Sequence, residues 1–133
     1  MVKTKDLHQT INFGVPPHDV FEALIDSKKH SEFTGAEAKI SKKVGGRFTA
    51  WDGWAEGENL EIVPDEKIVQ TWRGADWPEG HYSTITFDLK KDPNGTRLEF
   101  TQTGIPEEFY NDIAQGWNEW YWETLVDYFK RKR

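Results

Sequence analysis

Few side chains in this sequence could carry out covalent or acid–base chemistry. There is no cysteine, the serines lie in no nucleophile motif, and no two of the four histidines share one element at metal-ligand spacing. His81 is the first candidate for acid–base work, because it begins a strand near the expected mouth of a cavity, and Asp52 is the second. Each also has a structural interpretation, since Asp52-Gly53 is a hairpin signal and a hydrogen-bonded His81 could fix the loop of Trp77. We therefore expect no enzyme activity, no metal site and no cofactor.

The charge balance argues against nucleic acid as a partner. The 133 residues carry a net charge of −6, from 17 basic and 23 acidic side chains. Four of the basic residues are the final Lys130-Arg131-Lys132-Arg133, which leaves 13 basic against 23 acidic side chains in the rest of the chain. Phosphate backbones are bound by basic patches, which this composition does not favour. The basic tip is either a solvated helix end whose cations balance the helix dipole, or a docking handle for an acidic partner.

The length of the chain predicts one domain, residues 1–133. We also expect a cytoplasmic protein. No apolar run reaches the length of a membrane span, and the first six residues lack a signal-peptide pattern, so we expect no membrane association. The absence of cysteine fits a reducing compartment. Seven Trp, eight Phe and four Tyr provide the large buried area that one core needs.

The order of predicted elements indicates an α+β fold. Alternation predicts a strand over residues 6–13, and helical spacing predicts two short helices over 18–27 and 28–33. Several short strands follow, divided by turn signals, of which Asp52-Gly53 and Asn94-Gly95 are the strongest for hairpins because both central residues need a positive φ. The last element, 106–130, is a long helix. We expect one curved antiparallel sheet that wraps around this helix.

Two apolar stripes and an acidic flank are expected on the long helix at 100° per residue. The broad stripe has eight members: Tyr110, Ile113, Ala114, Trp117, Trp120, Tyr121, Leu125 and Tyr128. The second stripe, roughly opposite, consists of Trp122, Val126 and Phe129, and it either packs under the two short helices or forms an exposed patch that marks a partner site. Asp112, Glu119, Glu123 and Asp127 occupy the flank between them.

Gly116 and Trp77 each raise a question that the sequence leaves open. A glycine inside a helix costs about 1 kcal/mol relative to alanine, so we infer that the sheet or a loop approaches the backbone at Gly116. Trp77 precedes Pro78 at a predicted hairpin tip. It is either an exposed interface anchor, because tryptophan is enriched among binding hot spots, or a cover folded over the open end of the sheet.

Four polar residues fall on strand faces that otherwise point inward: Gln9, Gln70, Ser83 and Gln102. A polar group in a dry core is costly unless it is paired. These side chains either line a pocket and orient a small ligand, or pair with one another or lie at wet strand ends.

A set of landmarks in a fixed order resembles a known family. They are Gly45-Gly46-Arg47-Phe48, Asp52-Gly53, Val63-Pro64, Ile68-Val69, Trp72-Arg73, Trp77-Pro78-Glu79-Gly80-His81, Thr84-Ile85-Thr86, Gly104-Ile105-Pro106 and Gln115-Gly116-Trp117. Together they resemble the C-terminal domain of the activator of heat-shock protein 90 ATPase, a co-chaperone family of the START-like, or SRPBCC, superfamily. The resemblance covers about residues 11–129, and the segment 77–81 followed by 115–117 is its most specific part.

The resemblance implies a helix-grip fold and a non-catalytic role. Members of the family contact the N-terminal ATPase domains of the chaperone dimer and favour its closed state. Carried onto this sequence, the partner-binding candidates are Trp77, Glu79 and His81, with the acidic flank of the helix. The full co-chaperone has a separate N-terminal domain that binds the middle segment of the chaperone, for which 133 residues leave no room.

Two alternatives follow from the same superfamily. The first is a protein that binds a small apolar ligand between sheet and helix, with six candidate ligand-binding residues: Gln70, Trp72, Ser83, Gln102, Trp117 and Tyr121. The second is a cyclase-like or hydrolase-like enzyme that uses His81.

Overall fold

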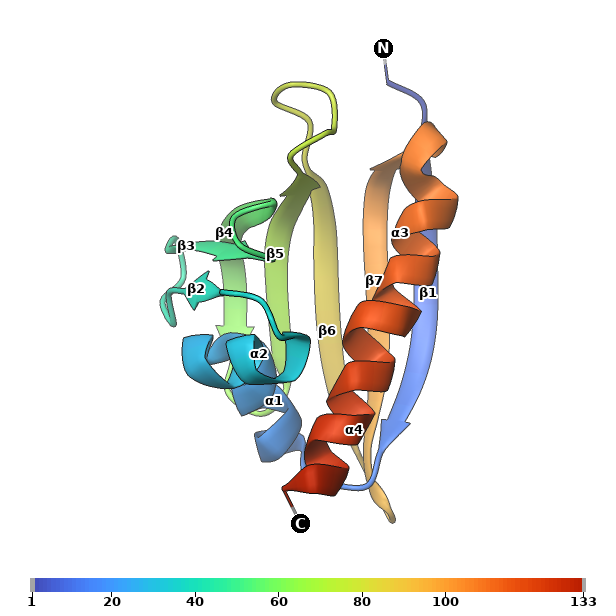
Figure 1. Ribbon diagram of the computed structural model, residues 1–133. Helices are drawn as coiled ribbons and strands as arrows, with labels where there is room; N and C mark the ends of the chain where they lie inside the picture. Colours follow the sequence, from blue (N-terminus) through green and yellow to red (C-terminus); the bar gives the residue numbers. More distant parts are fainter. Residues whose placement is uncertain (1, 133) are drawn as a thin grey trace.

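Seven antiparallel strands form one curved sheet, and a long C-terminal helix lies across its concave face (Figure 1). The computed structural model describes residues 2–132. The strand order is β1-β7-β6-β5-β4-β3-β2. The strands are β1 (Thr4–Phe13), β2 (Lys39–Ile40), β3 (Arg47–Ala50), β4 (Ala55–Val63), β5 (Lys67–Gly74), β6 (Ser83–Asp92) and β7 (Gly95–Pro106). This arrangement confirms the predicted α+β class.

Two short helices follow β1, as predicted, and the long helix has four consecutive parts. The short helices are α1 (Pro17–Ile25) and α2 (Ser27–Thr34). The parts of the long helix are η1 (Glu107–Phe109), α3 (Tyr110–Gly116), η2 (Trp117–Trp122) and α4 (Glu123–Arg131). The short helices lie beside the C-terminal end of the long helix, whereas the loop between β5 and β6 extends from the opposite end of the sheet (Figure 1).

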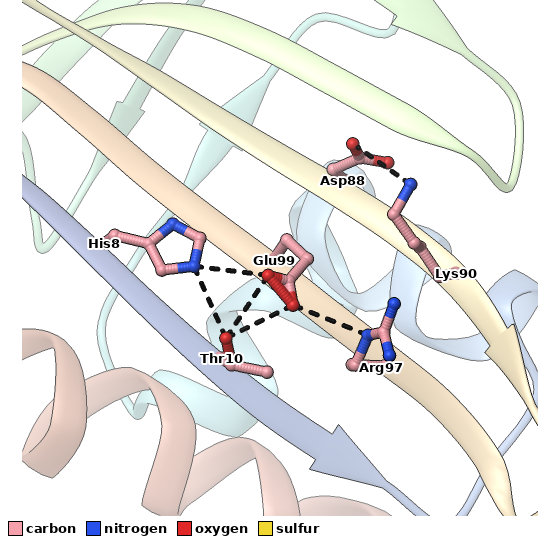
Figure 2. Close-up of polar contacts among 6 residues, drawn as sticks. All are labelled: His8, Thr10, Asp88, Lys90, Arg97 and Glu99. Atoms are coloured by element: carbon pink, nitrogen blue, oxygen red, sulfur yellow. Dashed lines mark hydrogen bonds and ion pairs between the residues drawn. The ribbon is translucent and has the colours of Figure 1, made fainter.

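The outer face of the sheet is polar, because successive side chains of a strand point to opposite sides. Glu99 of β7 lies between β1 and β6; its carboxylate accepts a hydrogen bond from Thr10 at 3.2 Å and lies 3.2 Å from His8 (Figure 2). Arg97 reaches the same carboxylate at 3.5 Å. His8 is 59% exposed, so these contacts are worth little individually. They identify a solvated face, and they place the core on the other side, towards the helix.

Both predicted hairpins are present, but one turns at a different residue pair. Asp52 and Gly53 have φ of 58° and 94°, as the sequence predicts. In the second hairpin Asp92 pairs with Gly95, so the central residues are Pro93 and Asn94. The prediction of a turn centred on Asn94-Gly95, with positive φ at both, is therefore wrong. Proline presets φ for the first central position of the turn that forms instead.

The middle of the long helix is a π-helical segment, which the sequence analysis did not predict. The amide of Glu123 donates to the carbonyl of Asn118, five residues earlier. The wider turn brings residues five apart onto one side. Trp117 and Trp122 consequently stack, with ring centroids 5.5 Å apart and an angle of 20° between the rings. The placement of Trp122 opposite Trp117 is therefore wrong, and Trp120, expected on the buried face, is 56% exposed.

The second stripe packs on the sheet and not under the short helices. Trp122 contacts Phe100 of β7, with ring centroids at 5.3 Å, and Phe129 meets Phe13 of β1 edge-on at 5.8 Å. The short helices instead pack against the first stripe, where Phe33 of α2 lies between Tyr121 and Tyr128. Both interpretations of the second stripe are thus corrected by the local widening of the helix, since it rotates Trp122 towards the sheet.

A chain of buried hydrogen bonds attaches α2 to the long helix. His30 Nδ1 donates to the carbonyl of Leu24 at 3.2 Å, and its Nε2 accepts from the Tyr121 hydroxyl at 3.4 Å. That hydroxyl also accepts from the Trp51 indole N–H at 3.1 Å. Burial lowers the pKa of His30 from 6.5 to about 4, because a charged imidazole would lose its hydration there.

The basic tip ends the long helix. Lys130 and Arg131 lie exposed in the last turn of α4, and Lys132 lies 3.8 Å from Glu32 of α2. Arg133 lies outside the described residues.

Gly116 is not needed for close packing, which corrects the inference from the sequence. A Cβ built there would meet only Trp120 Cδ1, at 3.8 Å, an ordinary contact. Its φ and ψ, −61° and −40°, suit any helical residue. Gly57 of β4 shows the opposite situation, because a Cβ at this position would overlap the carbonyl oxygen of Thr71 in β5.

Replacing these two glycines with alanine is expected to have opposite effects on stability. Gly116→Ala should raise the free energy of unfolding by about 0.5–1 kcal/mol, because it removes the helical cost of glycine without a clash. Gly57→Ala should lower it by roughly 1–3 kcal/mol through overpacking. Urea titration followed by circular dichroism measures both. A destabilised Gly116→Ala variant would show that something does pack on that backbone.

The buried His30 should make the protein less stable as the pH falls from 7.5 to 5. Its pKa is lower in the folded than in the unfolded chain, so in this window the unfolded chain binds more protons and unfolding is favoured. The linkage amounts to about 2 kcal/mol of unfolding free energy. Denaturant titrations at the two pH values should show this loss in the wild type and a smaller one in His30→Gln.

His18→Gln is the matched control for that measurement. His18 is exposed, and its hydrogen bond to Asp65 raises its pKa, so its linkage has the opposite sign. The variant should keep the full loss of stability. An equal pH dependence in wild type and His30→Gln would contradict the assignment to His30.

Candidate functional site

The space between the sheet and the long helix is almost completely filled. A cavity lined by the sheet, the short helices and the long helix there has a volume of only about 10 Å³. Aromatic rings occupy the interior, with Trp117 at 4.4 Å from Phe100 and 6.1 Å from Phe87 between ring centroids. Binding sites for drug-sized molecules usually have roughly 300–1,000 Å³, so this interior cannot receive one without rearrangement.

The polar residues predicted on the inner strand faces are paired with one another and with the helix. Gln102 Nε2 donates to Ser83 Oγ at 3.0 Å, and Ser83 Oγ donates to the carbonyl of Trp72 at 2.8 Å. Gln102 Oε1 in turn accepts from the indole N–H of Trp117 at 2.8 Å. Gln70 donates separately to Asn59 Oδ1 at 2.9 Å.

Gln9 performs for Trp122 the role that Gln102 performs for Trp117. Its Oε1 accepts from the Trp122 indole N–H at 2.7 Å, while its Nε2 donates to the carbonyl of Ala114 at 3.2 Å. Of the two interpretations of these polar residues, the structure shows pairing. The side-chain oxygens of Gln9 and Gln102 both accept hydrogen bonds from the long helix.

A pocket of about 410 Å³ opens at the end of the sheet from which the β5–β6 loop extends. Three parts of the chain build its wall: the turn between β3 and β4, the end of β5 with the following loop, and the N-terminal half of the long helix. The lining residues are Trp51, Trp54, Trp72, Asp76, Trp77, Phe109, Asp112, Ile113, Gly116, Trp117, Trp120 and Tyr121. Three of the six predicted ligand-binding residues, Trp72, Trp117 and Tyr121, belong to this wall, while Gln70, Ser83 and Gln102 do not.

The turn that carries Trp51 and Trp54 has an unusual backbone. Trp51 and Asp52 both have left-handed conformations, with φ of 55° and 58°. For a residue other than glycine this costs of order 1–3 kcal/mol and persists only where the surroundings enforce it. Here Asp52 exchanges two hydrogen bonds with Glu37, at 3.0 and 2.8 Å, and the Trp51 indole donates to Tyr121.

Trp77 folds inward and covers the open end of the sheet. Its side chain is 4% exposed, stacks on Phe109 at 6.3 Å and meets Trp72 at 5.3 Å. Arg73 holds the loop through its guanidinium, which donates to the carbonyls of Trp77, at 2.9 Å, and Pro78, at 3.2 Å. Of the two alternatives for Trp77, the structure shows the cover over the open end of the sheet and not the exposed interface anchor, because the indole is buried against Trp72 and Phe109.

The other predicted partner residues lie on the same loop. His81 Nε2 lies 2.8 Å from the carbonyl of Gly104, as expected for a residue that fixes the loop, and Glu79 is exposed. Asp52, the second acid–base candidate, accepts a hydrogen bond from the backbone of Glu37. His81, Asp52 and Glu79 are not lining residues of the 410 Å³ pocket.

Sequence reasoning missed the contribution of Trp51, Trp54 and Gly116 to this pocket. Asp52-Gly53 predicts a turn, and the signal that could have indicated the pocket is the pair of tryptophans, Trp51 and Trp54, that flank this turn. Gly116 was attributed to packing, whereas its missing side chain leaves space in the pocket.

Residues 2–132 contain neither a cluster suited to a metal ion nor a helix suited to span a membrane. No group of three or more His, Asp and Glu side chains in this range could hold a metal ion. None of its helices has both the length and the apolar character that crossing a bilayer requires.

The chain matches one family model over most of its length. A model described as "Activator of Hsp90 ATPase homolog 1-like protein" matches residues 14–130. The human protein named "Activator of 90 kDa heat shock protein ATPase homolog 1" is 32% identical over 117 residues, which are 88% of this chain and 35% of the human protein. The corresponding homolog of Dictyostelium discoideum is 34% identical over 116 residues, or 86% of this chain and 30% of the relative. The chain thus spans about a third of the length of these curated relatives.

Two solved structures share the fold of this chain. A crystal structure described as an HSP90 activator from Plasmodium falciparum has a TM-score of 0.81 and 30% identity, covering 87% of this chain and 89% of the other. Protein MLL2253 from Mesorhizobium loti, at 23% identity, shares the fold with a TM-score of 0.85 over 97% of this chain and 99% of its own. These similarities confirm the predicted helix-grip architecture. This chain belongs to the family of Activator of Hsp90 ATPase homolog 1-like proteins.

Proposed function

We propose that this chain is a non-catalytic interaction module that binds a chaperone of the 90 kDa heat-shock class in the cytoplasm. The observation that carries the proposal is that relatives named as activators of that chaperone's ATPase align over 86–88% of this chain. A protein of this kind acts by binding one conformation of its partner better than another. It needs a surface, not a catalytic group.

The surface that we propose for the partner runs from the β5–β6 loop along the exposed acidic flank of the long helix. Glu79 is exposed on this loop, and Asp112, Glu119, Glu123 and Asp127 are exposed along the helix. None of these side chains forms an ion pair within residues 2–132. Their negative charge is therefore free to meet a basic surface, which would steer association and fix its orientation. Trp77 and His81 would contribute indirectly, by holding the loop that carries Glu79.

The filled interior supports this proposal over the two alternatives. An apolar ligand between sheet and helix would have to displace the rings of Trp117 and Phe100, which pack on each other. It would also break the hydrogen bond from the Trp117 indole N–H to Gln102. For an enzyme, His81 would need a substrate within reach, and its Nε2 is occupied by the carbonyl of Gly104.

Charge reversal on the proposed surface should weaken binding to the isolated ATPase domain of the chaperone. We expect the double variant Glu79→Lys/Glu119→Lys to bind roughly tenfold more weakly in a surface plasmon resonance titration, with most of the change in the association rate. The effect should shrink at high salt, because exposed charges are screened.

The matched control is Glu61→Lys/Glu66→Lys. Both residues are exposed beside the turn at the other end of β5, and the variant changes the net charge by the same amount. It should bind like the wild type. Equal weakening by both variants would indicate net charge and not this surface, and absence of binding by the wild type would refute the proposed function.

A further inference from the structure

We propose that the 410 Å³ pocket is a binding site for a small organic cation of the quaternary or tertiary ammonium class. The site is distinct from the proposed chaperone surface in its chemistry, and its volume is at the lower end of the range for small-molecule sites. Six of the seven tryptophans of the chain line it. A site for an organic cation accounts for this concentration of indoles around one opening.

Two pairs of indoles in the wall meet edge to face. Trp51 meets Trp120 at an angle of 77° between the rings, and Trp54 meets Trp72 at 71°, with centroids 6.4 and 5.7 Å apart. Trp54 and Trp120 are 38% and 56% exposed, so part of each indole remains accessible at the pocket. An indole face is the strongest of the aromatic partners for a cation within about 6 Å of its centre.

The charges at the pocket complement a cation. Asp76 and Asp112 lie in its wall and are exposed, and the side-chain carboxylate of neither forms a hydrogen bond or an ion pair with any residue of the part that the structure describes. None of the described lining residues is basic. Arg73, which holds the neighbouring loop, directs its guanidinium at backbone carbonyls. An anionic or purely apolar occupant would leave the two carboxylates without a partner.

The acceptors that are free in the wall are the carboxylates of Asp76 and Asp112, and the indoles that make up most of the remaining wall favour an alkylated cation. A primary ammonium group carries three N–H donors that must be satisfied. The hydroxyl of Tyr121 is already engaged by Trp51 and His30, and the tryptophan indoles can only donate. An alkylated ammonium group carries at most one N–H, loses less hydration on entry, and gains from the ring faces.

Two further features fit a built site. The strained backbone of Trp51 is maintained at a cost, and it places an indole in this wall. Gly116, which no close packing requires, leaves room in the wall where any other residue would project a side chain. The strained turn at Trp51, the missing side chain at Gly116 and the unpaired carboxylates together indicate that this pocket is a built site.

The test is a titration of the full chain with choline and with its neutral isostere, in which a tert-butyl group replaces trimethylammonium. Binding is followed by tryptophan fluorescence and by the indole N–H resonances. Choline should bind saturably and at least tenfold more tightly than the isostere. Equal affinity for the two compounds, or no saturable binding of choline, would overturn the proposal.

Variants locate the site. Asp76→Asn/Asp112→Asn should weaken choline binding at least tenfold, while Glu123→Gln/Asp127→Asn, which removes the same number of charges farther along the long helix, should leave it unchanged. Gly116→Leu should abolish binding and keep a cooperative thermal transition, because its Cβ meets only the edge of Trp120. Unchanged binding in the double variant or in Gly116→Leu would place choline elsewhere and refute the assignment. No chaperone enters this assay, so its failure is distinguishable from a failure of the proposed function.

Discussion

The structure depends on the way in which two glutamines of the sheet hold two tryptophans of the helix. Gln102 and Gln9, on neighbouring strands β7 and β1, each accept an indole N–H, from Trp117 and Trp122 respectively. A polar group in a dry core is costly unless it is paired, so these bonds penalise any shift of the helix along the sheet. The π-helical segment is what allows both rings to face the sheet together.

This attachment decides where recognition can take place. Because the stacked indoles and the phenylalanines beneath them fill the interior, the space enclosed there falls to about 10 Å³. The 410 Å³ pocket opens at the end of the sheet, where the β3–β4 turn, the β5–β6 loop and the start of the helix converge. Asp112 belongs both to the acidic flank and to the wall of that pocket, so the two proposed recognition features lie next to each other.

The sequence was sufficient for the architecture, because strand alternation, hairpin signals and one long apolar helix are local patterns. It also allowed the pairing of the inward glutamines as an alternative, since burial of an amide requires a partner. It failed where a regular helix of 100° per residue was assumed. One widened turn moved Trp122 to the sheet and left Trp120 exposed, and periodicity alone cannot reveal such a turn.

The candidate site was harder to predict than the fold. The sequence leaves two alternatives for Trp77, because its exposure depends on what packs against it, here Phe109 from a segment more than thirty residues later. Gly116 was misinterpreted because a missing side chain can serve close packing or open space, and the sequence does not distinguish them. The pocket itself arises from three segments whose convergence only the tertiary structure shows.

The attachment of the helix can be tested most directly by hydrogen exchange of the seven indole N–H groups, resolved by nuclear magnetic resonance. The indoles of Trp117 and Trp122 should be protected until the whole chain unfolds, whereas that of the exposed Trp120 should exchange at once. Exchange of Trp117 and Trp122 at the rate of Trp120 would show that the helix is not held to the sheet in this way.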